Sequence, residues 1–190
     1  MNRAAFLDRD GVINRKPPEG QYVTRWEEMR FLPDVATAIA KLNEAGFRVI
    51  VISNQRCVAK GLVTEGGVDA LHERMRRELA AAGAIIDAIY YCPHEKSPVC
   101  SCRKPAPGML LTAAREHEID LAASWMIGDS DIDIAAGKSA GCRTARLIGE
   151  GQTGQGKADV VAESLLDAIH QIFEFPRAIP APRTLNGVTV

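Results

Sequence analysis

The sequence has no long hydrophobic run, almost no net charge and few aromatic residues, and each absence removes classes of function. No apolar stretch approaches the ~18 residues that cross a bilayer, so no membrane association is predicted. The 23 basic and 24 acidic side chains leave a net charge of −1, so no overall basic field attracts nucleic acid. Trp26 and Trp125 are interpreted as core or rim residues. The 190 residues, 46% of them hydrophobic, suffice for one domain with a core.

The start of the chain and its five cysteines bear on the cellular setting. Met1-Asn2-Arg3 leads directly into a strand-like run, without the apolar segment and cleavage site of a signal peptide. We therefore expect a cytoplasmic, reducing environment. Cysteines in such an environment favour metal binding or reactivity over disulfides.

Short strand-like runs alternate with longer helical patterns along the chain. Strands are expected at Ala4–Leu7, Arg48–Ser53, Ala88–Tyr91, Ser124–Ile127, Arg143–Ile148 and Asp159–Val161. Helices are expected at Pro33–Ala45, Thr64–Ala82, Pro107–His117, Asp131–Ala140 and Glu163–Phe173. This alternation predicts an α/β fold with a doubly wound, mostly parallel sheet. We expect a single domain over 1–173 without a separate cap domain, a Gly- and Gln-rich loop at Gly149–Lys157, and a C-terminal tail over 174–190.

Two aspartates follow the first predicted strand. In an extended chain the side chains of Asp8 and Asp10 point the same way, and that of Arg9 points away from them. Gly11 then permits a tight turn. Two convergent carboxylates suit a divalent cation, or a nucleophile beside a general acid. A solvated Asp-Gly turn is the simpler interpretation of this segment alone.

Polar groups also follow the second strand and precede the third predicted helix. Ser53, Asn54 and Gln55 carry a hydroxyl and two amides that can donate hydrogen bonds to phosphate oxygens. Arg103 and Lys104 lie on a loop because the prolines after them delay the helix. An arginine can bind a phosphate with two hydrogen bonds and a lysine can act as a point charge. An ordinary turn and two solvated cations are the alternatives.

A third acidic segment follows the strand expected at Ser124–Ile127. Asp129 stands at the strand end, near Asp8 if the two strands are neighbours, and Asp133 lies one helical turn later. Asp133 could support a metal site or cap the helix. In doubly wound sheets ligands bind beyond the carboxyl ends of the strands, where these segments fall.

Three thiols and one imidazole lie within eleven residues. Cys92, His94, Cys100 and Cys102 suit a closed, tetrahedral Zn²⁺ site in the segment 92–102. A disulfide or unrelated free thiols are the alternatives. With four protein ligands the zinc would be structural, and it would order the adjacent Arg103-Lys104 segment. His72, His117 and His170 lie in helical patterns without evident partners, so surface or packing roles are expected for them.

These motifs, in this order, resemble those of the haloacid dehalogenase-like phosphatases. The matching segments are Asp8-x-Asp10-Gly11, Ser53, Lys104 and Gly128-Asp129-x-x-x-Asp133. The resemblance runs from about Phe6 to Ile148 and implies a Rossmann-like, cap-less fold of that family. Without a cap the pocket is open unless loops such as Arg15–Tyr22 cover it.

The resemblance also implies a mechanism. Asp8 would attack phosphorus to give an aspartyl-phosphate, and Asp10 would first protonate the leaving oxygen and then deprotonate water. Lys104 and Mg²⁺ would offset the charge repulsion. The Mg²⁺ ligands would be Asp8, the Asp10 backbone carbonyl and Asp129, with Asp133 as an additional candidate.

The cysteine motif narrows the resemblance to one branch. Cys-x-His followed by Cys-x-Cys-Arg-Lys-Pro resembles heptose 1,7-bisphosphate 7-phosphatases and the phosphatase domain of histidinol-phosphate phosphatase. The expected substrate is a small phosphorylated sugar, and heptose 1,7-bisphosphate is the leading candidate. The protein is expected to be a monomer. Arg103 would hold the phosphate that is not cleaved. Arg56 departs from the small residue usual in the heptose enzymes and would bind a second phosphate or exclude the usual sugar. Histidinol phosphate, or a non-catalytic module that binds a phosphorylated ligand, are the alternatives.

Overall fold

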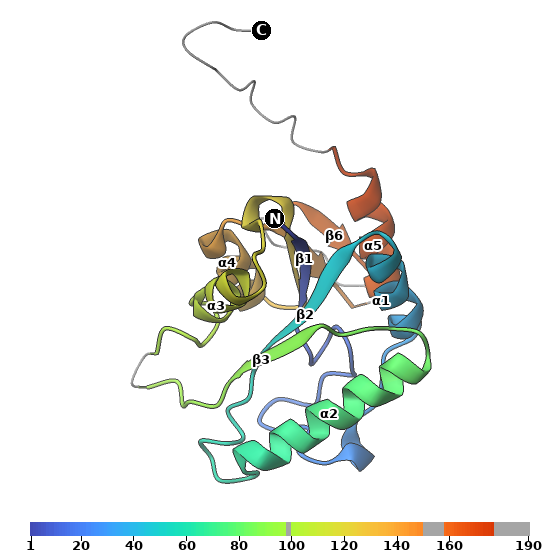
Figure 1. The fold of residues 1–190 in the computed structure, drawn as a ribbon. Helices are drawn as coiled ribbons and strands as arrows, with labels where there is room; N and C mark the ends of the chain where they lie inside the picture. Colours follow the sequence, from blue (N-terminus) through green and yellow to red (C-terminus); the bar gives the residue numbers. More distant parts are fainter. Residues whose placement is uncertain (98–99, 150–157, 177–190) are drawn as a thin grey trace, which may run out of the picture.

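Six strands form one central sheet, and all five neighbouring pairs are parallel (Figure 1). The computed structural model describes residues 1–97, 100–149 and 158–176. The strands run in the order β3-β2-β1-β4-β5-β6. Their bounds are β1 Arg3–Leu7, β2 Phe47–Asn54, β3 Ala88–Cys92, β4 Trp125–Gly128, β5 Arg143–Leu147 and β6 Val160–Ala162. The predicted doubly wound parallel sheet is confirmed.

Helices cover both faces of this sheet. The helices α1 (Val35–Glu44), α2 (Glu65–Ala81) and α5 (Leu165–Glu174) contribute to one hydrophobic cluster. The helices α3 (Gly108–Glu116) and α4 (Asp131–Ala140) contribute to a second cluster (Figure 1). Leu7 and Val51 belong to the first cluster, whereas Phe6 and Ile50 belong to the second, because successive side chains of a strand point to opposite faces. The strands are therefore buried on both sides, as expected for a parallel sheet.

The direction of chain progression reverses at β1. From β1 the chain moves outward to β2 and β3, and it then returns to β4 on the other side of β1. The backbone N–H of Asp8 donates to the carbonyl of Ile127 at 3.0 Å, so the carboxyl ends of β1 and β4 stay joined. A crevice forms at such a reversal because the crossover connections leave in opposite directions.

The expected elements are present with boundaries shifted by a few residues. Helix α1 begins at Val35 instead of Pro33, since Asp34 adopts a left-handed conformation with φ of 56°. Helix α5 ends at Glu174, and the following Phe175 packs against Trp125 with ring centroids 5.0 Å apart. The start of the expected tail therefore packs on the domain, while 177–190 and most of the expected glycine-rich loop lie outside the described residues.

Two short 3₁₀ turns were not expected from the sequence. They are η1 (Trp26–Glu28) and η2 (Leu121–Ala123), each three residues long. Among the described residues, no helix combines the length and apolar character needed to cross a bilayer.

Candidate active site

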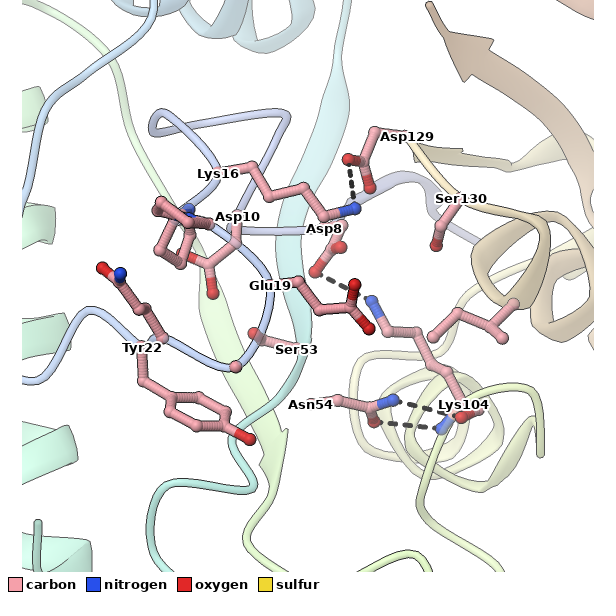
Figure 2. A pocket seen from close by; sticks show the side chains of 15 residues that line it. Asp8, Asp10, Lys16, Glu19, Tyr22, Ser53, Asn54, Lys104, Asp129 and Ser130 are labelled. Carbon is pink, nitrogen blue, oxygen red and sulfur yellow. Dashed lines mark hydrogen bonds and ion pairs between the residues drawn. The ribbon is translucent and has the colours of Figure 1, made fainter. Parts of the chain in front are cut away.

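Asp8 lies directly after β1, in the crevice between β1 and β4. Its Oδ1 atom accepts from the Arg9 backbone N–H at 2.7 Å and lies 2.8 Å from the Lys104 Nζ atom. Asp129 follows β4, so the two strand ends present two carboxylates to one cavity (Figure 2). Gly11 has a φ of 98°, and a Cβ atom there would overlap the carboxylate of Asp129. The glycine thus permits both the tight turn and the close approach of the two strand ends.

Three carboxylates form a cluster that fits a divalent cation. Asp8, Asp129 and Asp133 each offer an oxygen atom, and these atoms lie within 4.8 Å of one another. The buried Oδ1 atom of Asp129 has no hydrogen-bond partner in the structure. Carboxylate oxygens are the ligands that Mg²⁺ prefers. The donor set therefore fits the predicted magnesium site, with Asp133 in the cluster.

The negative charges of this cluster repel one another, and burial strengthens the effect on the pKa values of the carboxyl groups. Burial, followed by the charge of Asp133, raises the pKa of Asp8 to about 7, although Lys104 acts in the opposite direction. Burial also raises the pKa of Asp129 above its ordinary value. A bound cation would favour the ionised form of both groups.

Lys104 is buried at the centre of the site. Its Nζ atom lies 2.6 Å from Asp133 Oδ1 and donates to the carbonyl of Ile52 at 2.8 Å. Burial lowers the pKa of Lys104, but Asp8 and Asp133 outweigh that effect and raise it above its ordinary value. Asn54 accepts from the Lys104 backbone N–H and donates to its carbonyl, both at 3.1 Å. The lysine is thus charged and fixed at both its side chain and its backbone.

Asp133 combines the two roles considered for it. Its Oδ2 atom accepts from the backbone N–H of Ser130 at 3.2 Å and from the Ser130 hydroxyl, which caps α4. Its Oδ1 atom faces Lys104. Gly128 is needed here because a Cβ atom at that position would overlap Asp133.

Ser53 and Gln55 act as a pair at the end of β2. The Ser53 hydroxyl accepts a hydrogen bond from Gln55 Nε2 at 2.6 Å, so its own proton is available to a phosphate oxygen. Ser53 and Asn54 line the cavity. Gln55 is buried and does not line it, so its contact with Ser53 is its route to the site.

The cavity has a volume of about 260 Å³ and lies beneath the loop predicted to cover it. The residues of the strand ends and of the lysine loop that line it are Asp8, Asp10, Ser53, Asn54, Lys104 and Asp129. From the covering loop come Lys16, Pro17, Pro18, Glu19, Gly20, Gln21 and Tyr22. Lys16 is the residue that motif reasoning missed: its Nζ atom lies 2.7 Å from Asp129 Oδ2 (Figure 2). A cation next to two prolines, six residues after Asp10, is the signal that could have indicated it.

Two predicted phosphate ligands lie outside this cavity. The Arg56 Nε atom forms an ion pair with Glu95, and this partner raises the pKa of Arg56 above its ordinary value. Arg103 Nη1 donates to the carbonyl of His94 at 3.2 Å. Both arginines therefore bind the cysteine-containing loop, and their contact with a substrate stays a prediction.

The four predicted zinc ligands converge. The Sγ atoms of Cys92, Cys100 and Cys102 lie 3.4–3.6 Å apart, and His94 Nδ1 lies 3.2 Å from Cys102 Sγ. Zinc–sulfur bonds of about 2.3 Å place tetrahedral ligands ~3.8 Å apart. All five cysteines are free thiols, so the disulfide alternative does not hold. The cluster therefore has nearly the size of a tetrahedral zinc site.

Known proteins are similar to this chain in sequence and in fold. The HAD-hydrolase-like family model matches residues 101–168. The D-glycero-beta-D-manno-heptose-1,7-bisphosphate 7-phosphatase of Rhodopseudomonas palustris is 44% identical, over 77% of this chain and 84% of its own. The Yersinia pestis protein of the same name is 37% identical, over 94% of this chain and 95% of its own. A crystal structure of D,D-heptose 1,7-bisphosphate phosphatase from B. bronchiseptica, complexed with magnesium and phosphate, superimposes with a TM-score of 0.82. It is 36% identical and covers 90% of this chain and 98% of its own.

The parallel sheet and the strand-end carboxylates define a hydrolase of the haloacid dehalogenase class. The chain belongs to the haloacid dehalogenase-like phosphatase family, in the branch of the heptose-1,7-bisphosphate 7-phosphatases. The resemblance inferred from the motifs is thereby confirmed.

Proposed function

We propose that this protein is a Mg²⁺-dependent phosphomonoester hydrolase that removes the 7-phosphate of D-glycero-D-manno-heptose 1,7-bisphosphate. The observation that carries the proposal is the pairing of the Asp8 carboxylate with the buried ammonium of Lys104 at the reversal point of the sheet. Binding alone requires no nucleophile beside such a cation. The names of relatives up to 44% identical support the substrate.

The residues of this chain divide the work of phosphoryl transfer. Asp8 attacks phosphorus as the bond to the leaving sugar oxygen breaks, and Asp10 gives its proton to that oxygen. Asp10 then takes a proton from the water that attacks the aspartyl-phosphate, which releases phosphate and regenerates Asp8. Lys104 and the Ser53 hydroxyl bind phosphate oxygens throughout. Mg²⁺, held by Asp8, the Asp10 carbonyl and Asp129, supplies further charge compensation.

The zinc site has a structural role in this proposal. Four protein ligands leave no open position for water. Cys102 is two residues from Lys104, and Cys92 ends β3, so zinc would fix the loop between a strand and the catalytic lysine. The phosphate that is not cleaved would contact Arg103 and Arg56, next to this loop. We further propose that the protein acts as a monomer in the cytoplasm.

A panel of phosphate esters tests the proposal. Phosphate release with Mg²⁺ is measured for the two anomers of heptose 1,7-bisphosphate, fructose 1,6-bisphosphate, histidinol phosphate and p-nitrophenyl phosphate. We expect kcat/KM for one heptose anomer to exceed the others by at least ~10³-fold, within the usual range of ~10⁴–10⁸ M⁻¹s⁻¹. A preference for histidinol phosphate would replace the substrate and retain the chemistry. Phosphate release that is equally slow in wild type and Asp8→Asn would reject the hypothesis that the protein is an enzyme.

A further inference from the structure

Arg9, between the two catalytic aspartates, is completely buried. A buried guanidinium is costly unless charged and polar groups surround it. Its Nε atom donates to Asp10 Oδ1 at 3.2 Å, and its Nη2 atom lies 3.0 Å from both carboxylate oxygens. The expectation that this side chain points away from both aspartates is wrong for its guanidinium, because the long side chain reaches back to the carboxylate of Asp10. Arg9 does not line the cavity.

These contacts treat the two oxygen atoms of Asp10 differently. Oδ1 accepts from Arg9 Nε, from Arg9 Nη2 and from Asn14 Nδ2, the last at 2.8 Å. Among the described residues, Oδ2 accepts a hydrogen bond from the Arg9 Nη2 atom alone. A carboxylate oxygen that already accepts three hydrogen bonds is the less favourable place for a proton. Oδ2 is therefore the oxygen of Asp10 with the greater remaining capacity for a further hydrogen bond.

Arg9 is itself held by a neutral histidine from another element. Its Nη1 atom lies 3.1 Å from Nε2 of His72 on α2. A guanidinium only donates hydrogen bonds, so Nε2 must accept, and the single ring proton resides on Nδ1. Burial and the charge of Arg9 lower the pKa of His72 to about 3, which keeps the ring neutral. The Tyr91 ring and the imidazole form a T-shaped contact with centroids 5.5 Å apart.

We propose that Arg9, fixed by His72, is a positioning residue that aims Asp10 Oδ2 at the leaving oxygen and then at the attacking water. This inference rests on the proposed function. In the first step the Asp8–phosphorus bond forms while the bond between phosphorus and the leaving oxygen breaks, and that oxygen takes the proton from the Oδ2–H bond. In the second step Oδ2 takes a proton from water as oxygen attacks phosphorus and the Asp8–phosphorus bond breaks. Arg9 takes no part in either proton transfer and touches no substrate.

Two substitutions of His72 separate positioning from folding. His72→Gln retains a neutral amide that can accept from Arg9, whereas His72→Leu removes the acceptor and leaves Nη1 unpaired. Aryl and alkyl phosphates with leaving groups of increasing basicity report on proton donation, because poor leaving groups depend on the general acid most. The rate of the first step is measured by rapid quench at saturating Mg²⁺, and thermal unfolding of each variant checks the fold.

The expected result is selective. His72→Leu should slow cleavage of an alkyl phosphate by ~10–100-fold and of p-nitrophenyl phosphate by less than ~3-fold, since a general acid contributes about 10²–10⁴-fold. His72→Gln should stay within ~3-fold of wild type for both esters. Arg9→Lys should behave like His72→Leu, because an ammonium cannot replace the two-armed contact with Asp10. An equal loss for all esters, or equal rates for the two His72 variants, would overturn the positioning role. Failure of wild type to cleave any ester would instead reject the proposed function.

Discussion

The carboxylate site and the cysteine loop differ in how their side chains interact: the carboxylates repel one another, whereas the thiols and the imidazole have the spacing of ligands to one metal ion. At the carboxylate site the sheet forces Asp8, Asp129 and Asp133 together, and burial with mutual repulsion raises the pKa of Asp8. In the cysteine loop, three thiols and one imidazole converge at a spacing that suits one zinc ion, beginning at the last residue of β3. At the first site, clustered negative charge creates unfavourable electrostatics that a cation can relieve, whereas a zinc ion at the second would fix the loop.

The two regions meet at Lys104. Its side chain belongs to the carboxylate site, and its backbone follows Cys102 by two residues. Asn54 at the end of β2 fixes that backbone from the other side. Substitutions in the carboxylate site should therefore abolish catalysis and leave the fold intact, whereas substitutions in the cysteine loop should disturb both catalysis and the local structure.

Removal of the nucleophile should give the largest effect. Asp8→Asn is expected to lower kcat by ~10⁴-fold or more, because Asp133, the other carboxylate beside Lys104, does not line the cavity and cannot replace the nucleophile. Phosphate release by purified protein in the presence of Mg²⁺ measures it. The exposed Asp69→Asn variant, away from the cavity, serves as a control and should retain wild-type turnover. Comparable loss in both variants would contradict the assignment of Asp8.

Removal of one zinc ligand should give the next largest effect. Cys102→Ser is expected to reduce bound zinc from one per chain to well below one, and to lower kcat/KM by ~10–100-fold through displacement of Lys104. Elemental analysis of protein purified without chelator and steady-state kinetics measure both. Cys142→Ala is the matched control, since Cys142 lies outside the cluster. Wild-type protein that contains no zinc would contradict the assignment of the cysteine loop as a structural zinc site.

The electrostatic strain at Asp8 predicts a pH-dependent stability. Its pKa is about 7 in the folded protein and about 4 in an unfolded chain, so the folded state binds the proton more tightly. Stability of the metal-free protein should therefore fall as the pH rises from about 4 to 7. At pH 8 without Mg²⁺, Asp8→Asn should melt ~4–8 °C above wild type, a difference that disappears near pH 4.

Thermal unfolding at both pH values, with and without Mg²⁺, measures this effect. Added Mg²⁺ should raise the melting temperature of wild type more than that of Asp8→Asn, because the cation binds only the folded carboxylate cluster. A difference between the two proteins that is independent of pH would show that Asp8 carries no stored strain.

Arg56, which pairs with Glu95 of the cysteine loop, tests whether this loop also contributes to substrate binding. If it leaves Glu95 to bind the second phosphate, Arg56→Ser should raise KM for a bisphosphate by ~3–10-fold, leave kcat unchanged and spare a monophosphate. Glu95→Gln, which frees the arginine from its partner, should lower KM for the bisphosphate. An unchanged KM in Arg56→Ser would remove Arg56 from the substrate site.

The sequence predicts the strand ends well and the contacts between distant segments poorly. Asp8 and Asp129 follow buried strands and Ser53 is the second-last residue of β2. Parallel strands bring their carboxyl ends to one edge, so local pattern and topology suffice to predict these positions. The pairing of Arg9 with His72 joins residues 63 positions apart. It depends on how α2 packs on the sheet, which periodicity does not specify. The expected packing role of His72 fits its burial, but the expectation that it has no partner is wrong, because its ring contacts the guanidinium of Arg9.

Lys16 provides the smallest expected effect and tests how the cavity responds to a cation. Burial lowers its pKa, but contact with Asp129 and the charges of Asp8 and Asp133 raise it above the ordinary value. Its ammonium and a bound Mg²⁺ would compete for the same Asp129 oxygen, and its side chain is 56% exposed, so the pair is weak. Lys16→Met should tighten Mg²⁺ binding by ~1.5–5-fold, as measured by calorimetric titration in the absence of substrate. Lys41→Met on α1 should leave the affinity unchanged. Weaker Mg²⁺ binding in Lys16→Met would mean that the lysine orders the carboxylates for the metal, and the loop would then belong to the rigid part of the site.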